Sequence, residues 1–153
     1  YEYILRAMPT LGISSGSSPI AFYTDMNIND NNALDILEKL GSCLRIEEDK
    51  FDAFTSIFGA GPAFISHLSN TLAKIAKEHG FEEPEPWIRE ILDGTSHIHK
   101  SDEKNSFENI VDMVASKGGV TEAALNKINE KGIEDIWNQA INDAIIKSKA
   151  LGD

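Results

Sequence analysis

Helical periodicity dominates this chain from Asp49 to its end, and glycines or prolines interrupt it at intervals. Apolar residues spaced three or four apart lie on one face of a helix, so each stretch predicts a helix with one apolar stripe. Because every stripe needs a partner surface, residues 49–153 are predicted to form an all-α domain. The expected helices span Asp49 to Phe58, Pro62 to Gly80, a stretch begun by Pro84 and Pro86, Phe107 to Val114, Ala124 to Ile128, and Ile133 to Ile145.

The first 48 residues follow a different pattern. β-forming residues at Tyr3 to Leu5 and Ile20 to Tyr23 flank a Gly/Ser-rich loop, which predicts two strands. Asp30 is a plausible N-cap for a helix that Gly41 ends, and Cys43 to Glu47 alternates like a third strand. A β-β-α-β segment cannot cover both faces of its sheet alone. The fold class expected is therefore mainly α, with a small β-β-α-β segment of a truncated α/β domain at residues 1–48. The start at Tyr1, without Met, also suggests a piece of a longer protein.

Charge and cysteine content exclude several classes of protein. The net charge is −11, and no Lys/Arg cluster offsets it, so binding to nucleic acid or to anionic membrane surfaces is not expected. No apolar run approaches the ~20 residues of a membrane span. Cys43 is the single cysteine, so no internal disulfide can form, and a reducing, cytoplasmic location is expected.

The helical pattern breaks once in an unusual way, at Val114 to Thr121. Gly118 and Gly119 precede a predicted helix with Thr121 as its N-cap, and the helical pattern resumes at Glu122. Adjacent glycines before a helix can direct several backbone N–H groups at one anion, such as a carboxylate. The alternative is that the glycines only supply the backbone conformation that ends one helix and starts the next. The segment alone leaves both interpretations open.

Other candidate motifs do not indicate a site of their own. Gly59-Ala60-Gly61-Pro62 lacks the third glycine of a dinucleotide fingerprint, since Phe64 occupies that place, and predicts a tight turn. The histidines lack the spacing and the carboxylate partners of a metal site, so no bound metal is expected. They are His67, His79, His97 and His99.

The helices are many for about 100 residues, and their apolar stripes are wide. A helical bundle that associates with a second copy of itself explains this surplus without any chemistry. The final helix in particular can face a second subunit as readily as its own core. Self-association without catalysis is therefore the main alternative to an enzymatic function.

Four segments taken in order resemble one family. They are Arg6-Ala7-Met8-Pro9, Asp52-Ala53-Phe54-Thr55, Gly59-Ala60-Gly61-Pro62-Ala63-Phe64 and Ser116-Lys117-Gly118-Gly119-Val120-Thr121. The chain resembles the C-terminal part of pyrroline-5-carboxylate reductase, an NAD(P)H-dependent enzyme that makes proline. The resemblance implies an intertwined homodimer, which in that family often assembles further, and a preceding Rossmann domain that binds the cofactor. Residues 1–48 then correspond to the end of the Rossmann domain, and residues 49–153 to the dimerisation and substrate-binding domain.

The same resemblance implies a site. Ser116, Lys117, Gly118, Gly119, Val120 and Thr121 would bind the carboxylate of the cyclic imine. The Thr121 hydroxyl would act near the ring nitrogen, as the catalytic residue. Met8, Pro9 and Thr10 would lie beside NADP or NAD in the full-length parent. No cofactor is expected on this fragment alone, and the fragment is expected to be inactive.

The chain also departs from the family pattern. Thr10 stands where the family usually has Asn, Lys117 where it has Pro, and Met113 where it often has a polar residue. A divergent paralogue, or a non-catalytic dimerisation module acting on another imine or none, is the alternative function.

Overall fold

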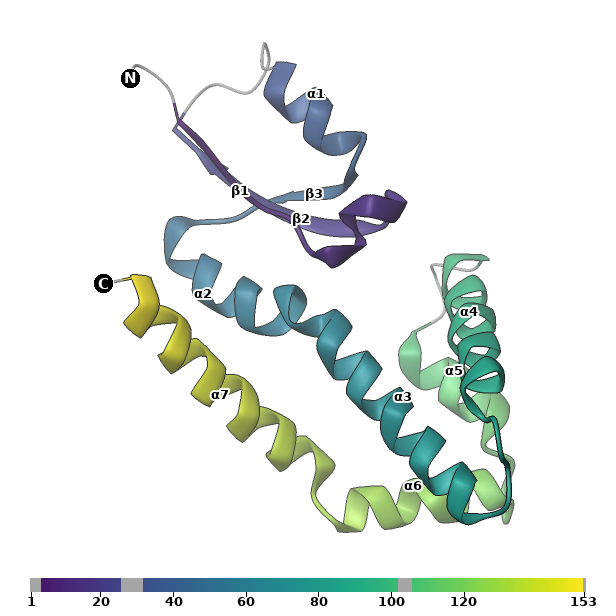
Figure 1. Ribbon diagram of the computed structural model, residues 1–153. Helices are drawn as coiled ribbons and strands as arrows, with labels where there is room; N and C mark the ends of the chain where they lie inside the picture. Colours follow the sequence, from purple (N-terminus) through teal and green to yellow (C-terminus); the bar gives the residue numbers. More distant parts are fainter. Residues whose placement is uncertain (1–3, 26–31, 102–105, 153) are drawn as a thin grey trace. The chain divides into compact units, whose positions relative to one another are not determined.

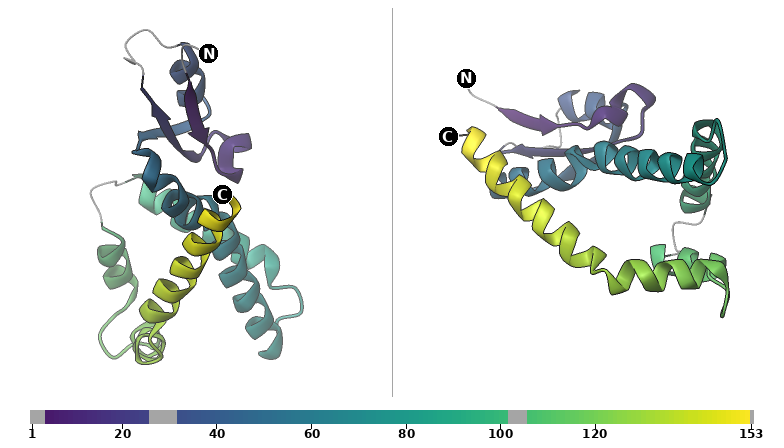
Figure 2. Two further views of the ribbon diagram at one scale, coloured as in Figure 1. Left: turned by 90° about the vertical axis from the view of Figure 1, so that its left-hand side faces the viewer. Right: turned by 60° about the horizontal axis from the view of Figure 1, so that its bottom comes forward.

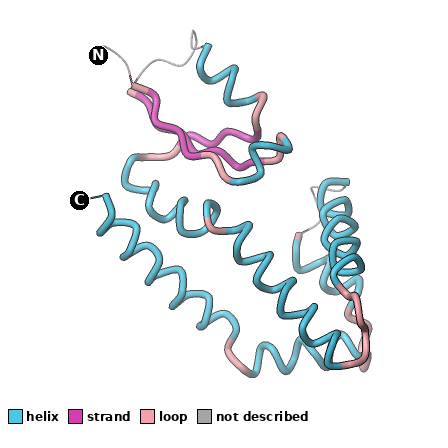
Figure 3. Tube along the Cα trace, in the orientation of Figure 1, coloured by secondary structure: helices cyan, strands magenta, loops and turns pink. Residues whose placement is uncertain are grey.

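The computed structural model describes residues 4–25, 32–101 and 106–152. The chain divides into two compact units, Tyr1–Ser66 with Gln139–Asp153, and His67–Asn138. Helices make up most of the described residues, and the strands are confined to the N-terminal region (Figure 3). This confirms the predicted fold class, mainly α with a small β-β-α-β segment. The division into units follows contacts within the chain, and the domain boundary at residue 48 stays a prediction.

The first unit contains a three-stranded mixed sheet (Figure 1). Strands β1 (Leu5–Met8) and β2 (Ser18–Thr24) are antiparallel and are joined through a 3₁₀ helix at Leu11–Ser15. Strand β3 (Gly41–Arg45) runs parallel to β2 and follows α1 (Asn32–Glu38). A parallel pair needs such a crossover, whereas an antiparallel pair does not. Among the strands of the described residues, β1 comes first in the sheet order and lies next to β2.

Several predicted boundaries differ in the structure. The first strand, predicted at Tyr3 to Leu5, is observed as β1 at Leu5–Met8, since pairing with β2 extends to Met8. Helix α1 ends at Glu38, and β3 covers Gly41–Arg45 instead of Cys43 to Glu47. Gly41 pairs with Ser18, and a Cβ at Gly41 would collide with the Ser18 carbonyl. The glycine thus permits close strand pairing and does not serve as the stop of the helix. The predicted N-cap Asp30 lies outside the described residues.

The core of the first unit lies between the sheet and the helix that follows it. Ala21 of β2 is completely buried, and it packs with Phe51 and Phe54 from α2 (Phe51–Phe54). Ile20 and Phe22 are also buried, but alternation along the strand directs them to the other face. Figure 1 shows α1 and α2 on opposite sides of the sheet.

The helix predicted from Asp49 to Phe58 is composite. A 3₁₀ turn at Glu48–Lys50 leads into α2, and a π-helical turn, η4, follows at Thr55–Gly59. The Ala60 N–H donates to the Thr55 carbonyl at 2.9 Å, the wider bond of a π turn. Helix α3 (Gly61–Glu78) then begins one residue before Pro62. Proline is tolerated in the first turn of a helix because the N–H groups there have no partner within the helix.

The remaining helices are α4 (Glu85–Ser101), α5 (Phe107–Val114), α6 (Val120–Glu130) and α7 (Ile133–Gly152). Ser106 caps α5 by accepting the Asn109 N–H at 3.1 Å. Gly132 has φ of 72° at the turn from α6 into α7, which Figure 2 shows. Near the C-terminus of α7, the Ser148 hydroxyl donates to the Asp52 carboxylate at 2.6 Å, within the first unit.

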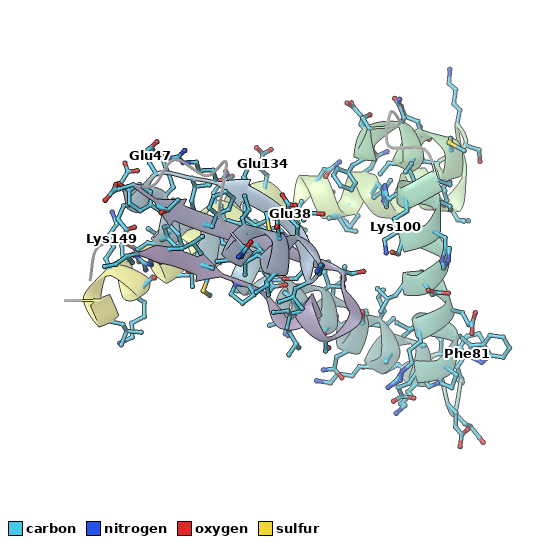
Figure 4. The ribbon with its side chains drawn as sticks, turned by 90° about the horizontal axis from the view of Figure 1, so that it is seen from above. Glu38, Glu47, Phe81, Lys100, Glu134 and Lys149 are labelled. Carbon is cyan, nitrogen blue, oxygen red and sulfur yellow. The ribbon has the colours of Figure 1, made fainter. Side chains whose placement is uncertain are left out.

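The second unit buries few large side chains. Ala73, Ile88 and Ile110 are buried there. Many other apolar residues of the unit stay exposed, and Figure 4 shows Phe81 pointing away from the ribbon. Examples are Leu68, Trp87, Ile91, Phe107, Met113 and Val114. Exposed apolar surface on this scale is typical of a surface that another chain covers.

Candidate functional site

The loop between α5 and α6 carries most of the predicted site residues. Gly118 has φ of 74°, whereas Gly119 has φ of −84°. A Cβ at Gly119 would lie 2.6 Å from the Ser116 Oγ, closer than side chains tolerate. Both glycines are therefore required by the loop, Gly118 for its left-handed backbone and Gly119 for its close approach to Ser116.

Both glycine N–H groups have acceptors within the chain. The Gly118 N–H donates to the Oε2 atom of Glu122 at 2.8 Å, and the Gly119 N–H donates to the Ser116 carbonyl at 2.9 Å. A carboxylate thus already binds one N–H of the loop, although it comes from the chain itself. Glu122 was not among the predicted site residues. Its position could have been recognised from the spacing of a capping box, in which an acidic residue lies three positions after the N-cap.

Thr121 does not cap α6. The N-cap is Gly119, and Thr121 is the second residue of the helix, half-buried in its first turn. The correction follows from backbone geometry, since Gly119 has the extended conformation of an N-cap and accepts the Ala123 N–H at 3.2 Å. Thr121 accordingly belongs to the first turn of α6, whose first N–H groups have no acceptor within a helix.

The other residues of the loop are open to solvent. Ser116, Lys117 and Val120 are exposed, and Val120 keeps 89% of its surface accessible. Lys117 precedes Gly118 in the chain and lies two residues before the N-cap of α6. The groups that could bind a small anion here are the first N–H groups of α6, the Thr121 hydroxyl and the Lys117 side chain, since the Gly118 N–H is bound to the Glu122 carboxylate.

Met8, Pro9 and Thr10 lie at the end of β1. Thr10 is buried, its N–H donates to the Ser18 Oγ at 2.8 Å, and the two hydroxyl oxygens are 3.1 Å apart. The Thr10 hydroxyl also accepts the Gly12 N–H, which caps the 3₁₀ helix. Met8 packs against the core cluster and Pro9 is half-buried, so both keep exposed surface. Met8 to Thr10 belong to the first unit, and Ser116 to Thr121 belong to the second.

The described residues show no metal site and no membrane-spanning helix, and neither Cys43 nor the hollow at the α6–α7 turn indicates a second functional site. Among the described residues, no three His, Cys, Asp or Glu side chains are arranged to hold a metal ion. Within the same ranges, every helix is too short or too polar to cross a membrane. Burial, with a contribution from Glu38, raises the pKa of the Cys43 thiol, which disfavours the reactive thiolate. A shallow hollow at the α6–α7 turn, lined by Gly132, Ile133 and Glu134, contains none of the predicted site residues.

These observations define a mainly helical protein in which a small mixed sheet precedes the helices and a glycine-pair loop opens one of them. Comparison with known proteins identifies the family. Residues 48–151 match the family model described as pyrroline-5-carboxylate reductase dimerisation, and the chain belongs to that family.

Individual relatives agree with this assignment. The chain is 33% identical to pyrroline-5-carboxylate reductase of Aquifex aeolicus, with 97% of this chain and 57% of the relative aligned. It is 31% identical to that of Staphylococcus haemolyticus, over 97% of this chain and 56% of the relative. The chain therefore spans a little over half the length of these curated relatives.

Solved structures show the same fold. A pyrroline-5-carboxylate reductase from Streptococcus pyogenes matches with a TM-score of 0.78 at 29% identity, covering 97% of this chain and 59% of that one. A Plasmodium falciparum pyrroline carboxylate reductase with NADP bound matches with a TM-score of 0.84 at 22% identity, covering 99% and 59%. At that lower identity, the second match supports the fold alone.

Proposed function

We propose that this chain is the C-terminal part of an NAD(P)H-dependent reductase that converts 1-pyrroline-5-carboxylate to L-proline. The observation that carries this proposal is the family match over residues 48–151, joined to reductase relatives that align with 97% of the chain. Residues 1–48 would be the end of the cofactor domain, and residues 49–153 the dimerisation and substrate-binding domain. A non-catalytic module is not favoured, because the relatives named above are described as reductases along nearly the whole chain.

The α5–α6 loop is the proposed site of the substrate carboxylate. Its support is the N-terminus of α6, whose first N–H groups have no acceptor within a helix, next to Gly118, whose N–H a substrate carboxylate would take over from Glu122. Lys117 adds positive charge, and Thr121 supplies a hydroxyl in the first turn of the helix. The ring nitrogen of the imine would then lie within reach of Thr121, the proposed catalytic residue.

NADPH or NADH would supply the hydride that the imine carbon accepts and would become NADP⁺ or NAD⁺, while the ring nitrogen would take up a proton from solvent through the Thr121 hydroxyl. The exposed surfaces of Met8 and Pro9 fit a cofactor contact at the end of β1. The Thr10 hydroxyl is bound to Ser18 and Gly12, so its proposed role is to shape the segment beside the cofactor. The chain itself contributes orientation of the two reactants, which can account for much of the rate of such a reaction.

The exposed apolar side chains of the second unit support a homodimer in which these helices are covered. Assembly of dimers into larger oligomers and a cytoplasmic location are part of the same proposal. Light scattering of the protein at micromolar concentration tests the dimer, and a monomer at that concentration would contradict it.

Turnover of the imine with NADPH by the full-length protein tests the function. This chain alone is expected to give no turnover. Thr121→Ala should lower kcat/KM by about 10²-fold, the lower end for loss of a general acid or base, whereas Thr121→Ser should retain most of it. An unchanged Thr121→Ala enzyme would refute the role of the hydroxyl. A full-length protein that reduces no cyclic imine would refute the function.

A substrate without the carboxylate tests the loop separately. Removing a charged hydrogen-bonding group costs about 1.5–3 kcal/mol, so the ring 1-pyrroline should show kcat/KM about 10–100-fold lower. Equal values for the two imines would place the carboxylate outside the loop while leaving the reductase activity intact.

A further inference from the structure

Arg6 lies on β1, the strand that leads into the proposed cofactor segment. In the β1–β2 register, Arg6 is opposite Tyr23 and Met8 is opposite Ala21. Since side chains alternate along a strand, Arg6 and Met8 share one face of the sheet. That face also carries the buried Ala21 and packs against α2.

The Arg6 guanidinium makes two contacts with the helical segment below the sheet. Its central carbon lies 4.2 Å from the centroid of the Phe51 ring, and it forms an ion pair with the Glu48 carboxylate. Phe51 is 2% exposed, so the ring has a fixed position in the core. A planar cation stacked on an immobile ring is held in direction as well as in distance.

Met8 forms the second attachment of the same strand face. Its terminal methyl lies 3.5 Å from the place a Cβ on Gly59 would take, and the Thr55 side chain borders the same space. Phe51, Thr55 and Gly59 are four residues apart and follow one side of α2 and its π turn. Arg6 and Met8 therefore attach β1 to this segment at two successive points.

We propose that Arg6 is a positioning residue. Through Phe51 and Glu48, it fixes the direction in which β1 leaves the sheet, and so the placement of Met8, Pro9 and Thr10. The part of the inference that concerns cofactor kinetics rests on the proposed function, whereas the part that concerns the placement of the segment does not.

The test compares two arginines of the same sheet in the full-length protein. Arg6→Met keeps the apolar stem but removes the charge. Arg45→Met is the control, because Arg45 lies on β3 and donates to the Thr24 carbonyl at 2.9 Å. Arg6→Met should raise KM for NADPH and lower kcat/KM for NADPH by about tenfold or more, as expected for a misplaced reactant. KM for the imine should stay within twofold, and Arg6→Lys should restore part of the loss.

Hydrogen exchange supplies a measurement that does not depend on activity. The peptide from Ala7 to Ser18 should exchange faster in Arg6→Met than in the wild type, and should stay unchanged in Arg45→Met. Unchanged exchange in Arg6→Met overturns the proposal even where the wild type is an active reductase. Faster exchange in a protein that reduces no imine would support the positioning role and reject the proposed function. Equal kinetic losses in the two variants would overturn the specific role of Arg6.

Discussion

The two compact units of this chain obtain their stability in different ways. In the first unit, Ala21, Phe51 and Phe54 form a buried cluster that side chains from distant parts of the sequence complete. In the second unit, large apolar side chains such as Trp87 and Ile91 remain 70% and 60% exposed. The first unit therefore has a buried core within the chain, whereas the described residues of the second leave large apolar side chains exposed that the proposed dimer would cover.

The largest difference in folding stability between the units should appear when an aromatic ring is removed from each in turn. Phe51→Ala should destabilise the protein by about 3–5 kcal/mol, because it removes a buried ring and leaves a cavity. Phe81→Ala is the matched control, since Phe81 is 61% exposed, and it should change the free energy of unfolding by about 0.5 kcal/mol or less. Urea denaturation measures both values. Equal losses of stability in the two variants would show that Phe81 is covered in solution and that the two units do not differ in apolar burial at these positions.

Sequence patterns predicted the elements of both units because the signals are local. Apolar spacing located the helices, and β-forming residues located β2, whereas β1 begins where the predicted strand Tyr3 to Leu5 ends. The start of β3 was missed because it depends on a tertiary contact, the pairing of Gly41 with Ser18. The contact of Arg6 with Glu48 could not be predicted from the sequence, since the two residues are 42 positions apart and no periodicity links them.

The candidate site was predicted less completely than the fold. The glycine pair was recognisable because few other residues suit such a loop, and Gly118 indeed has a positive φ. Thr121 was placed as the helix cap because hydroxyl residues favour that position, but Gly119 takes it. Glu122 was missed because, in sequence, it is an ordinary first-turn acidic residue. The binding roles of Ser116 to Thr121 and of Met8 to Thr10 stay predictions.

A smaller effect on stability is expected at the α5–α6 loop of the second unit, where the contact concerned joins residues only four positions apart, Gly118 and Glu122. Glu122→Ala removes the acceptor of the Gly118 N–H and a negative charge at the N-terminus of α6. The expected loss of stability is about 0.3–1 kcal/mol, well below that of Phe51→Ala. Glu122→Gln keeps an acceptor oxygen and should lose less. Thermal unfolding gives the stabilities, and exchange of the Gly118 amide should accelerate in the alanine variant. An unchanged Gly118 exchange rate would show that the amide has another acceptor in solution.

The smallest effect concerns an ion pair between two helices of the second unit. Lys77 of α3 and Glu85 of α4 are joined by a bond of 2.7 Å between Nζ and Oε1, and both side chains are about half exposed. The hydrogen bond from Lys77, followed by a backbone hydrogen bond, lowers the pKa of Glu85 below its ordinary value of 4.5. Because the pKa is lower in the folded state, the pair stabilises the fold above about pH 4.5. That stabilisation is lost as the pH falls through the pKa of the folded state. Exposure to solvent and salt keeps the effect small.

Lys77→Met should return the pKa of Glu85 towards its ordinary value, and should remove this part of the acid sensitivity. Lys74→Met is the control, since it removes a lysine from the same helix, less than one turn earlier. Carboxyl chemical shifts of Glu85, followed from neutral to acidic pH, measure the change directly. If Lys77→Met leaves the Glu85 titration unchanged, or if Lys74→Met shifts it equally, then α3 and α4 are not joined by this pair in solution. The second unit would then lack one of its contacts between helices, and its dependence on a partner surface would be greater still.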